Sequence, residues 1–231
     1  MNSMENSMSD HPGTALGDAL GADLSCCPKR GDIDQLDRSA IAELIQRERS
    51  ARDAGRWDVM AACFHPETKI DVSWFNGGAA DFVAATKRVA EAGKTLSLHR
   101  LSPAVVTLNG DRALAETDAE MLGFSTLDGV EVCGVHQVRL LWRAQTLDER
   151  WMIAGLHCVY VRGLLLACNP ARLPVIDEAV LAQFRPSYRY LSYVLTKNGM
   201  PPRDDLPGVD RPESIIALRA AETAWLSQRR P

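Results

Sequence analysis

The stretch Leu98–Glu116, LHRLSPAVVTLNGDRALAE, predicts two β-strands joined by a tight turn. Apolar residues lead into Asn109-Gly110-Asp111 and resume directly after it. Asn-Gly between apolar runs is a strong short-range hairpin signal, because a type I′ turn needs positive φ at both central positions. Strand alternation then places four residues on one face of the first strand: His99, Leu101, Pro103 and Val105.

His99 is the residue of chemical interest in this stretch, because imidazole is the side chain whose unperturbed pKa lies near neutrality. Two interpretations follow from the stretch alone. One is a histidine that packs in the core or at the surface, and the other is an acid–base group in a pocket. Residues elsewhere in the chain bear on the choice.

Length and composition favour a globular protein with one main domain. The chain has 231 residues, 46% of them hydrophobic and 24% charged, with a formal net charge of −4. Acidic and basic residues are interspersed, so no basic patch indicates nucleic acid. No apolar run of about 18 residues predicts a membrane helix. The N-terminal residues lack the basic and apolar regions of a signal peptide, so we expect a cytoplasmic protein.

The sequence contains no motif for a metal or a cofactor. Its six cysteines include the adjacent pair Cys26-Cys27 but form no Cys-x-x-Cys pair and no zinc-ligand spacing. A Gly-rich phosphate loop and a His-Glu-x-x-His motif are also missing. We therefore expect no metal, no cofactor and no disulfide framework, so that any chemistry comes from the side chains of the chain itself.

The order of the predicted elements indicates an α+β fold. Residues 1–32 are expected to be a flexible leader, residues 33–168 the main domain, and residues 169–231 a Pro-rich helical extension that covers a pocket mouth or a subunit interface. In the main domain we expect helices near 39–54, 57–64 and 79–92, and strands at 68–75, 98–109, 113–124, 130–143 and 151–162, with turns at 76–78 and 128–129.

The first predicted helix has one face that begins apolar and becomes charged. Helical spacing brings together Ile41, Leu44, Ile45, Glu48, Arg49 and Arg52. Asp53 follows directly, and Gly55 is expected to end the helix.

Several short motifs, in this order and at this spacing, resemble the SnoaL-like branch of the nuclear transport factor 2-like superfamily. They are Asp53-Ala54-Gly55-Arg56-Trp57-Asp58, Phe64-His65-Pro66, Ile70-Asp71-Val72, His99, Asn109-Gly110-Asp111-Arg112-Ala113, and Trp151 with Ala154-Gly155-Leu156. The resemblance implies a cone-shaped barrel in which a strongly bent antiparallel sheet wraps around three N-terminal helices. It implies no single reaction, because the superfamily includes isomerases, dehydratases, cyclases, dehydrochlorinases and non-catalytic members.

Within that branch the chain looks most like scytalone dehydratase and hexachlorocyclohexane dehydrochlorinase, which share an Asp–His dyad. The resemblance places the dyad at Asp53 and His99, where the carboxylate would orient the imidazole as a general base. The chain departs from scytalone dehydratase at two tyrosine positions, which are Arg52 and Val72 here. Scytalone itself is therefore not the expected substrate.

Eight further positions complete the candidate site. Arg139 is a candidate partner for an oxyanion or carboxylate, and Tyr160 is a candidate general acid. The candidate substrate contacts are Val72, Trp74, Thr117, Met121, Gln137 and Cys158. Core packing is the alternative interpretation of Tyr160, and a solvated surface position is the alternative for Arg139.

The strand at 130–143 gives two conflicting indications. Its even positions, which include His136, are nearly all apolar, and this pattern predicts that the even face is buried. The resemblance instead directs the odd positions Gln137 and Arg139 into the pocket, which gives His136 a structural role. Val135 and Leu141 add apolar character to the odd face, so we also expect a homodimer or larger assembly on the outer face of the sheet.

Two classes of function remain open. The first is a cofactor-independent lyase or isomerase, in which His99 removes a proton from a small, largely apolar molecule, aromatic ones included, with loss of water, halide or a small carbonyl fragment. The second is a non-catalytic binding or assembly subunit, like the β subunits of ring-hydroxylating dioxygenases. A hydrogen bond between Asp53 and His99 inside an enclosed apolar cavity would favour the first.

Overall fold

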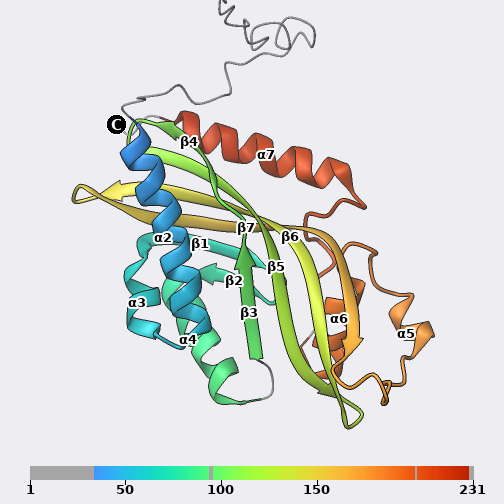
Figure 1. The fold of residues 1–231 in the computed structure, drawn as a ribbon. Helices are drawn as coiled ribbons and strands as arrows, with labels where there is room; N and C mark the ends of the chain where they lie inside the picture. The colour runs from blue at the N-terminus through green and yellow to red at the C-terminus, as the bar shows by residue number, and fades with distance from the viewer. Residues whose placement is uncertain (1–33, 94–95, 201, 229–231) are drawn as a thin grey trace, which may run out of the picture. The chain divides into compact units, whose positions relative to one another are not determined.

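A strongly curved, seven-stranded sheet is the main feature of the described residues, 34–93, 96–200 and 202–228 of the computed structural model (Figure 1). The leader predicted at residues 1–32 lies outside them. The strand order is β2-β1-β7-β6-β5-β3, and β4 also pairs with β5. The strands are β1 (Phe64–Val72), β2 (Phe75–Gly78), β3 (Leu96–Leu101), β4 (Val105–Asn109), β5 (Arg112–Leu127), β6 (Val130–Leu147) and β7 (Arg150–Ala167).

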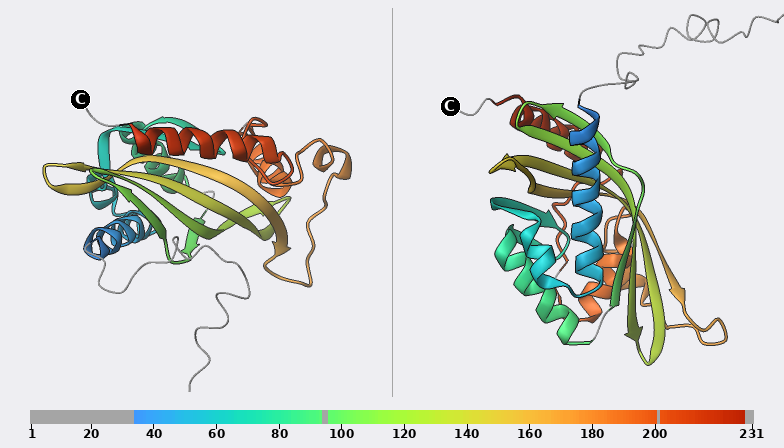
Figure 2. Two further views of the ribbon diagram at one scale, coloured as in Figure 1. Left: turned by 90° about the horizontal axis from the view of Figure 1, so that it is seen from above. Right: turned by 60° about the vertical axis from the view of Figure 1, so that its left-hand side comes forward.

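Three helices pack against the concave side of this sheet (Figure 2). They are α2 (Gln35–Asp53), α3 (Trp57–Ala62) and α4 (Ala79–Glu91). Ile41 and Ile45 of α2 and Phe82 of α4 enter one hydrophobic core with Trp142 and Leu156 of the sheet. The predicted α+β class, with a bent sheet around three N-terminal helices, is confirmed. One strand pair differs from the prediction, because β1 and β7 run parallel while the other pairs are antiparallel.

The curvature of the sheet has a local cause in its three long strands. β5, β6 and β7 have 16, 18 and 18 residues. The pairing of β6 with β7 shifts register at Gln137/Val138 and again at Arg143/Ala144. Bulges bend a strand and increase its twist. The long strands therefore curve around the helices and leave space on their concave side.

The hairpin that opens the sequence analysis differs in detail from the expected one. Asn109 pairs with Arg112, so Gly110 and Asp111 form the two-residue turn. Only Gly110 of these two has positive φ, at 61°, which is the type II′ pattern rather than type I′. The type I′ pattern occurs instead at Asp128-Gly129, with φ values of 47° and 78°, where the sequence also predicts a turn.

The first predicted strand of that hairpin is interrupted. β3 ends at Leu101 and β4 begins at Val105, because Pro103 has no N–H to contribute to a ladder. The gap changes the phase of the side chains: Val106 is buried, whereas Val105 is 73% exposed. The expected single face from His99 to Val105 is therefore wrong beyond Leu101.

The turn expected at Asn76-Gly77-Gly78 lies earlier in the chain. Ser73 and Trp74 form the turn between β1 and β2, and residues 76–78 pair with β1. This shift matters for the site, because it places Trp74 at the end of the sheet where a turn can project its side chain.

The C-terminal residues supply three further helices: α5 (Glu178–Leu181), α6 (Arg189–Lys197) and α7 (Pro212–Ser227). α7 lies across the outer face of the sheet, on the side opposite α2 (Figure 2). Its buried Glu222 pairs with Arg143 of β6 at 2.7 Å and His157 of β7 at 2.8 Å. None of the helices in the described residues is long and apolar enough to cross a membrane.

Candidate functional site

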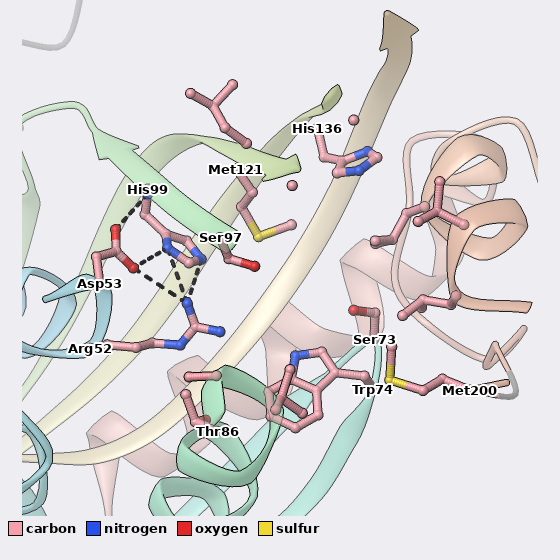
Figure 3. A pocket seen from close by; sticks show the side chains of 18 of the residues that line it. Arg52, Asp53, Ser73, Trp74, Thr86, Ser97, His99, Met121, His136 and Met200 are labelled. Atoms are coloured by element: carbon pink, nitrogen blue, oxygen red, sulfur yellow. Dashed lines mark hydrogen bonds and ion pairs between the residues drawn. The ribbon is translucent and has the colours of Figure 1, made fainter. Parts of the chain in front are cut away.

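A cavity of about 320 Å³ lies between the concave face of the sheet and the helices α4 and α6 (Figure 3). Most of its polar lining comes from the end of α2, the β1–β2 turn and the inner faces of β3 and β6, and Thr86 of α4 and Asn198 complete it. Apolar side chains form most of the remaining wall: Trp57, Trp74, Met121, Leu122, Val194 and Leu195. Such a cavity, with a few polar groups among apolar walls, has the form of a small-molecule site.

Asp53 and His99 meet at one end of this cavity. Asp53 is the last residue of α2, and His99 lies in the middle of β3 with its side chain only 4% exposed. Oδ1 of Asp53 is 2.8 Å from Nδ1 of His99, and Oδ2 accepts the backbone N–H of His99 at 2.6 Å. Both carboxylate oxygens therefore fix the histidine. A neutral His99 that donates from Nδ1 keeps its lone pair on Nε2.

Burial controls the charge states of this pair. It is the largest effect on His99 and, with the charges of Arg49 and Arg52, it lowers the pKa of the imidazole to about 3 against the opposing effect of Asp53. Burial acts to raise the pKa of Asp53, but the hydrogen bonds from His99 and the charge of Arg52 leave it below its ordinary value. At neutral pH the pair is a carboxylate and a neutral imidazole.

Arg52 lies beside the dyad. Its Nη1 is 3.2 Å from Nδ1 and 3.2 Å from Nε2 of His99, and 3.5 Å from Oδ1 of Asp53. Burial lowers the pKa of the guanidinium to about 10, so it stays charged at neutral pH. The site thus holds a cation next to a neutral base.

His136 lies at the opposite part of the cavity, on the same row of the sheet as His99. Met121 pairs with His99 on one side and with His136 on the other, so the backbones at the two histidines lie two strand spacings apart, about 10 Å. A Cβ at Gly134 would come within 2.6 Å of Nε2 of His136, and one at Gly163 within 2.8 Å of Nδ1. The two glycines leave the space that this ring occupies.

Burial also determines the charge of His136. It lowers the pKa of this imidazole to about 4. The Nδ1 atom is buried and has no hydrogen-bond partner among the described residues. His136 is therefore a second neutral histidine in the cavity wall, although the resemblance assigned it a structural role.

Helix α6 contributes the wall that faces the sheet. Leu191, Val194 and Leu195 line the cavity, and Asn198 and Met200 follow directly after the helix. Met200 and Trp74 both line this part of the cavity and are labelled in Figure 3. The C-terminal residues thus form part of the cavity wall, and their role as the cover of its mouth stays a prediction.

Of the ten candidate site residues, four line the cavity: Asp53, His99, Trp74 and Met121. Arg139 and Gln137 do not, because the odd positions of β6 face outward. Arg139 is 2.9 Å from Glu116 and 2.9 Å from Asp118 on the outer face, and Gln137 donates to Glu120. The placement of these two residues in the pocket is therefore wrong, and the apolar pattern of the even positions gives the correct orientation.

The other four candidates are packed away from the cavity lining. The hydroxyl of Tyr160 accepts the backbone N–H of Ser73 at 2.8 Å, and burial raises its pKa well above the ordinary value. Thr117 accepts a hydrogen bond from Nε1 of Trp142 at 3.2 Å. Burial raises the pKa of Cys158 to about 12, and Val72 packs against the core. Their expected contact with a substrate is not supported by these positions.

The sequence did contain a signal for two of the lining residues that were missed. Arg52 continues the helical face that begins with Ile41, and a charged residue on a core-facing stripe indicates a buried charge. His136 lies among apolar even positions of its strand. Ser73 and Ser97, which also line the cavity, carried no comparable signal. Among the residues that the structure describes, no group of three or more His, Cys, Asp or Glu side chains is placed to hold a metal ion.

Comparison with known proteins agrees with this fold. Pea pathogenicity protein 2 of Fusarium vanettenii is 28% identical to this chain over 200 residues, which cover 84% of this chain and 85% of that protein. A hexachlorocyclohexane dehydrochlorinase of known structure has a TM-score of 0.51 at 11% identity, over 64% of this chain and 99% of that one. A Novosphingobium aromaticivorans structure assigned provisionally to scytalone dehydratase has a TM-score of 0.49 at 12% identity, over 64% and 99%.

The family model of the SnoaL-like domain matches residues 34–157, the span that contains α2 to β6 and most of the residues that line the cavity. This match covers more than half of the chain. The protein therefore belongs to the SnoaL-like domain family of the nuclear transport factor 2-like superfamily.

Proposed function

We propose that this protein is a cofactor-independent lyase or isomerase that uses His99 as a general base on a small, largely apolar molecule. The observation that carries the proposal is the 2.8 Å hydrogen bond between Asp53 and His99 at the wall of a mostly apolar cavity. Such an arrangement is expected of an enzyme rather than of a non-catalytic subunit.

The chemistry follows from the hydrogen bonds of the dyad. Asp53 accepts from Nδ1 and so leaves the lone pair of Nε2 available for a proton of the substrate. When His99 takes that proton, the adjacent carboxylate stabilises the imidazolium. The apolar walls around the dyad lower the local dielectric and so strengthen this electrostatic effect. Loss of a leaving group would give a lyase, and return of the proton to another carbon would give an isomerase.

Hydrogen–deuterium exchange tests this proposal before the natural substrate is known. Small aromatic ketones and hydroxyketones in D₂O would be incubated with the protein, and loss of a C–H signal would be followed by proton NMR. We expect exchange or elimination with the wild type. We expect His99→Gln and Asp53→Asn each to lose about 10²–10⁴-fold of that rate. The double variant should lose little more than either single variant, because both residues serve one proton transfer.

A matched control uses a buried polar group outside the cavity lining. Tyr160→Phe removes a hydroxyl that bonds Ser73 and should lower stability while it leaves the exchange rate per folded molecule unchanged. Melting temperatures give the folded fraction of each variant. An undiminished rate per folded molecule in His99→Gln would contradict the proposal.

A further inference from the structure

Arg52 is only partly engaged by the protein, although it is nine-tenths buried. Its side chain is 10% exposed, and it lines the cavity. All of its hydrogen bonds with described residues use Nη1, which approaches His99 and Asp53, and this leaves Nη2 without a partner among those residues. Nε is buried and has no partner among the described residues. Figure 3 shows the guanidinium between His99 and Thr86, at the wall of the pocket.

Within the part of the chain that the structure describes, the neighbouring charges do not supply the missing hydrogen-bond partner. The charge of Glu48 raises the pKa of Arg52, but the carboxylate pairs with Arg49 at 2.9 Å. Asp53 directs both of its oxygens to His99, and its contact with Arg52 is long, at 3.5 Å. A buried guanidinium with free N–H groups is costly unless an acceptor is bound, and an anionic oxygen is the acceptor that it binds most strongly.

We propose that Arg52 binds an anionic oxygen of the substrate, a carboxylate or a phenolate, so that the substrate class is a small, largely apolar molecule with one acidic group. This inference rests on the proposed function only for the statement that the cavity is the substrate site. A cavity of about 320 Å³ with tryptophan, methionine and leucine walls has room for an aromatic or aliphatic body next to the acidic group.

Anion binding at Arg52 would also prepare the base. Nη1 of Arg52 lies 3.2 Å from each ring nitrogen of His99, so its charge is next to Nε2, the nitrogen that must accept the proton. This charge is one of the effects that lower the pKa of His99. An anionic oxygen bound to the guanidinium would offset the charge. His99 would then be a stronger base with the acidic substrate bound than in the empty pocket.

Binding of benzoate and benzamide tests the inference without any turnover. The two probes have nearly the same shape, but only benzoate is an anion. By isothermal titration calorimetry we expect the wild type to bind benzoate about tenfold more tightly than benzamide, or better, as expected for a charge-assisted hydrogen bond. Arg52→Gln should lose this preference, and Arg52→Lys should keep part of it. Arg139→Gln, which removes an arginine from the outer face, should keep all of it.

The outcomes separate this inference from the proposed function. His99→Gln should keep the preference for benzoate while it loses deuterium exchange. Equal binding of the two probes by the wild type, no binding of benzoate, or an unchanged preference in Arg52→Gln would overturn the inference. If Arg52→Gln fails to fold, the wild-type preference and its partial retention in Arg52→Lys decide. A benzoate preference without any His99-dependent exchange would overturn the proposed function and support anion binding.

Discussion

At the scale of single residues, the notable feature is that two histidines in one cavity are both held neutral by burial. The pKa is about 3 for His99 and about 4 for His136, against an ordinary value of 6.5. His99 has the carboxylate of Asp53 to accept its Nδ1–H, whereas Nδ1 of His136 has no partner among the described residues. The first can therefore stabilise a proton after transfer, and the second is suited to donate or accept a neutral hydrogen bond.

Both histidines have a lower pKa in the folded protein than in the unfolded chain, and this predicts a pH dependence of stability. In the unfolded chain a histidine binds a proton near pH 6.5. In the folded protein His136 binds one only near pH 4 and His99 only near pH 3. The unfolded state therefore binds more protons in this window, and the free energy of unfolding should fall as the pH falls from 6.5 toward 4. The slope is at most about 1.4 kcal/mol per pH unit for each group.

Urea unfolding of wild type and His136→Gln at several pH values measures this effect. The free energy of unfolding of the variant should fall less steeply with falling pH than that of the wild type, by up to about 1.4 kcal/mol per pH unit, the contribution of one proton. This holds whatever the stability of the variant at pH 7. The NMR signal of His136 in the folded wild type should not titrate above pH 5. Identical slopes for the two proteins would show that His136 is not held neutral.

At the scale of elements, glycine positions determine the shape of the inner face of the sheet. Gly134 and Gly163 make room for the ring of His136, and Gly123 pairs with Gly134 on the next strand. This floor lets an imidazole lie against the sheet with cavity space above it. The bend at the bulges of β6 and β7 and the wall of α6 then close the cavity around it.

Two glycine substitutions on this floor should behave differently. In Gly134→Ala the new methyl group meets Nε2 of His136 at 2.6 Å, so the ring must move, at a cost of about 1–3 kcal/mol of stability. In Gly123→Ala the nearest atom is 4.0 Å away, which is an ordinary contact. We expect a lower melting temperature and a displaced His136 NMR signal in Gly134→Ala and little change in Gly123→Ala. Equal effects of the two would contradict the packing role of Gly134.

At the scale of the whole molecule, α7 occupies part of the outer sheet face on which the sequence predicts an oligomer. Leu141 is buried there, and it lines the same small cavity as Leu226 of α7. Helix α7 therefore covers part of the apolar surface of that face, so this part needs no second copy of the chain to bury it. Leu164 and Leu166 of β7 remain 54% and 50% exposed beyond it.

The homodimer stays a prediction, now limited to the strip around Leu164 and Leu166. Light scattering at micromolar concentration should give a dimer or larger assembly for the wild type. The double variant Leu164→Glu/Leu166→Glu should be monomeric, because buried carboxylates would oppose association. Ile216→Glu, at a 69% exposed position on α7, is the control and should leave the assembly intact. A monomeric wild type would end this prediction.

The sequence by itself was enough to determine the α+β class and the three N-terminal helices, because these depend on periodicity, which is a local property. The candidate dyad of Asp53 and His99 came from the resemblance to the SnoaL-like branch. The alternation of β6 also predicted the correct buried face. Transferring positions from relatives instead placed Arg139 and Gln137 inside, because a shift of one residue moves every side chain of a strand to the other face.

Only the tertiary structure decided which polar groups share the cavity. The row that aligns His99, Met121 and His136 depends on the register of three strands. Arg52 lies 3.2 Å from the imidazole of His99 on β3 and has no shorter polar contact with any of the described residues, which follows from how the end of α2 meets the sheet. Contacts between residues far apart in the chain are fixed by strand register, bulges and helix packing, and these arise from the whole core rather than from any one stretch of sequence.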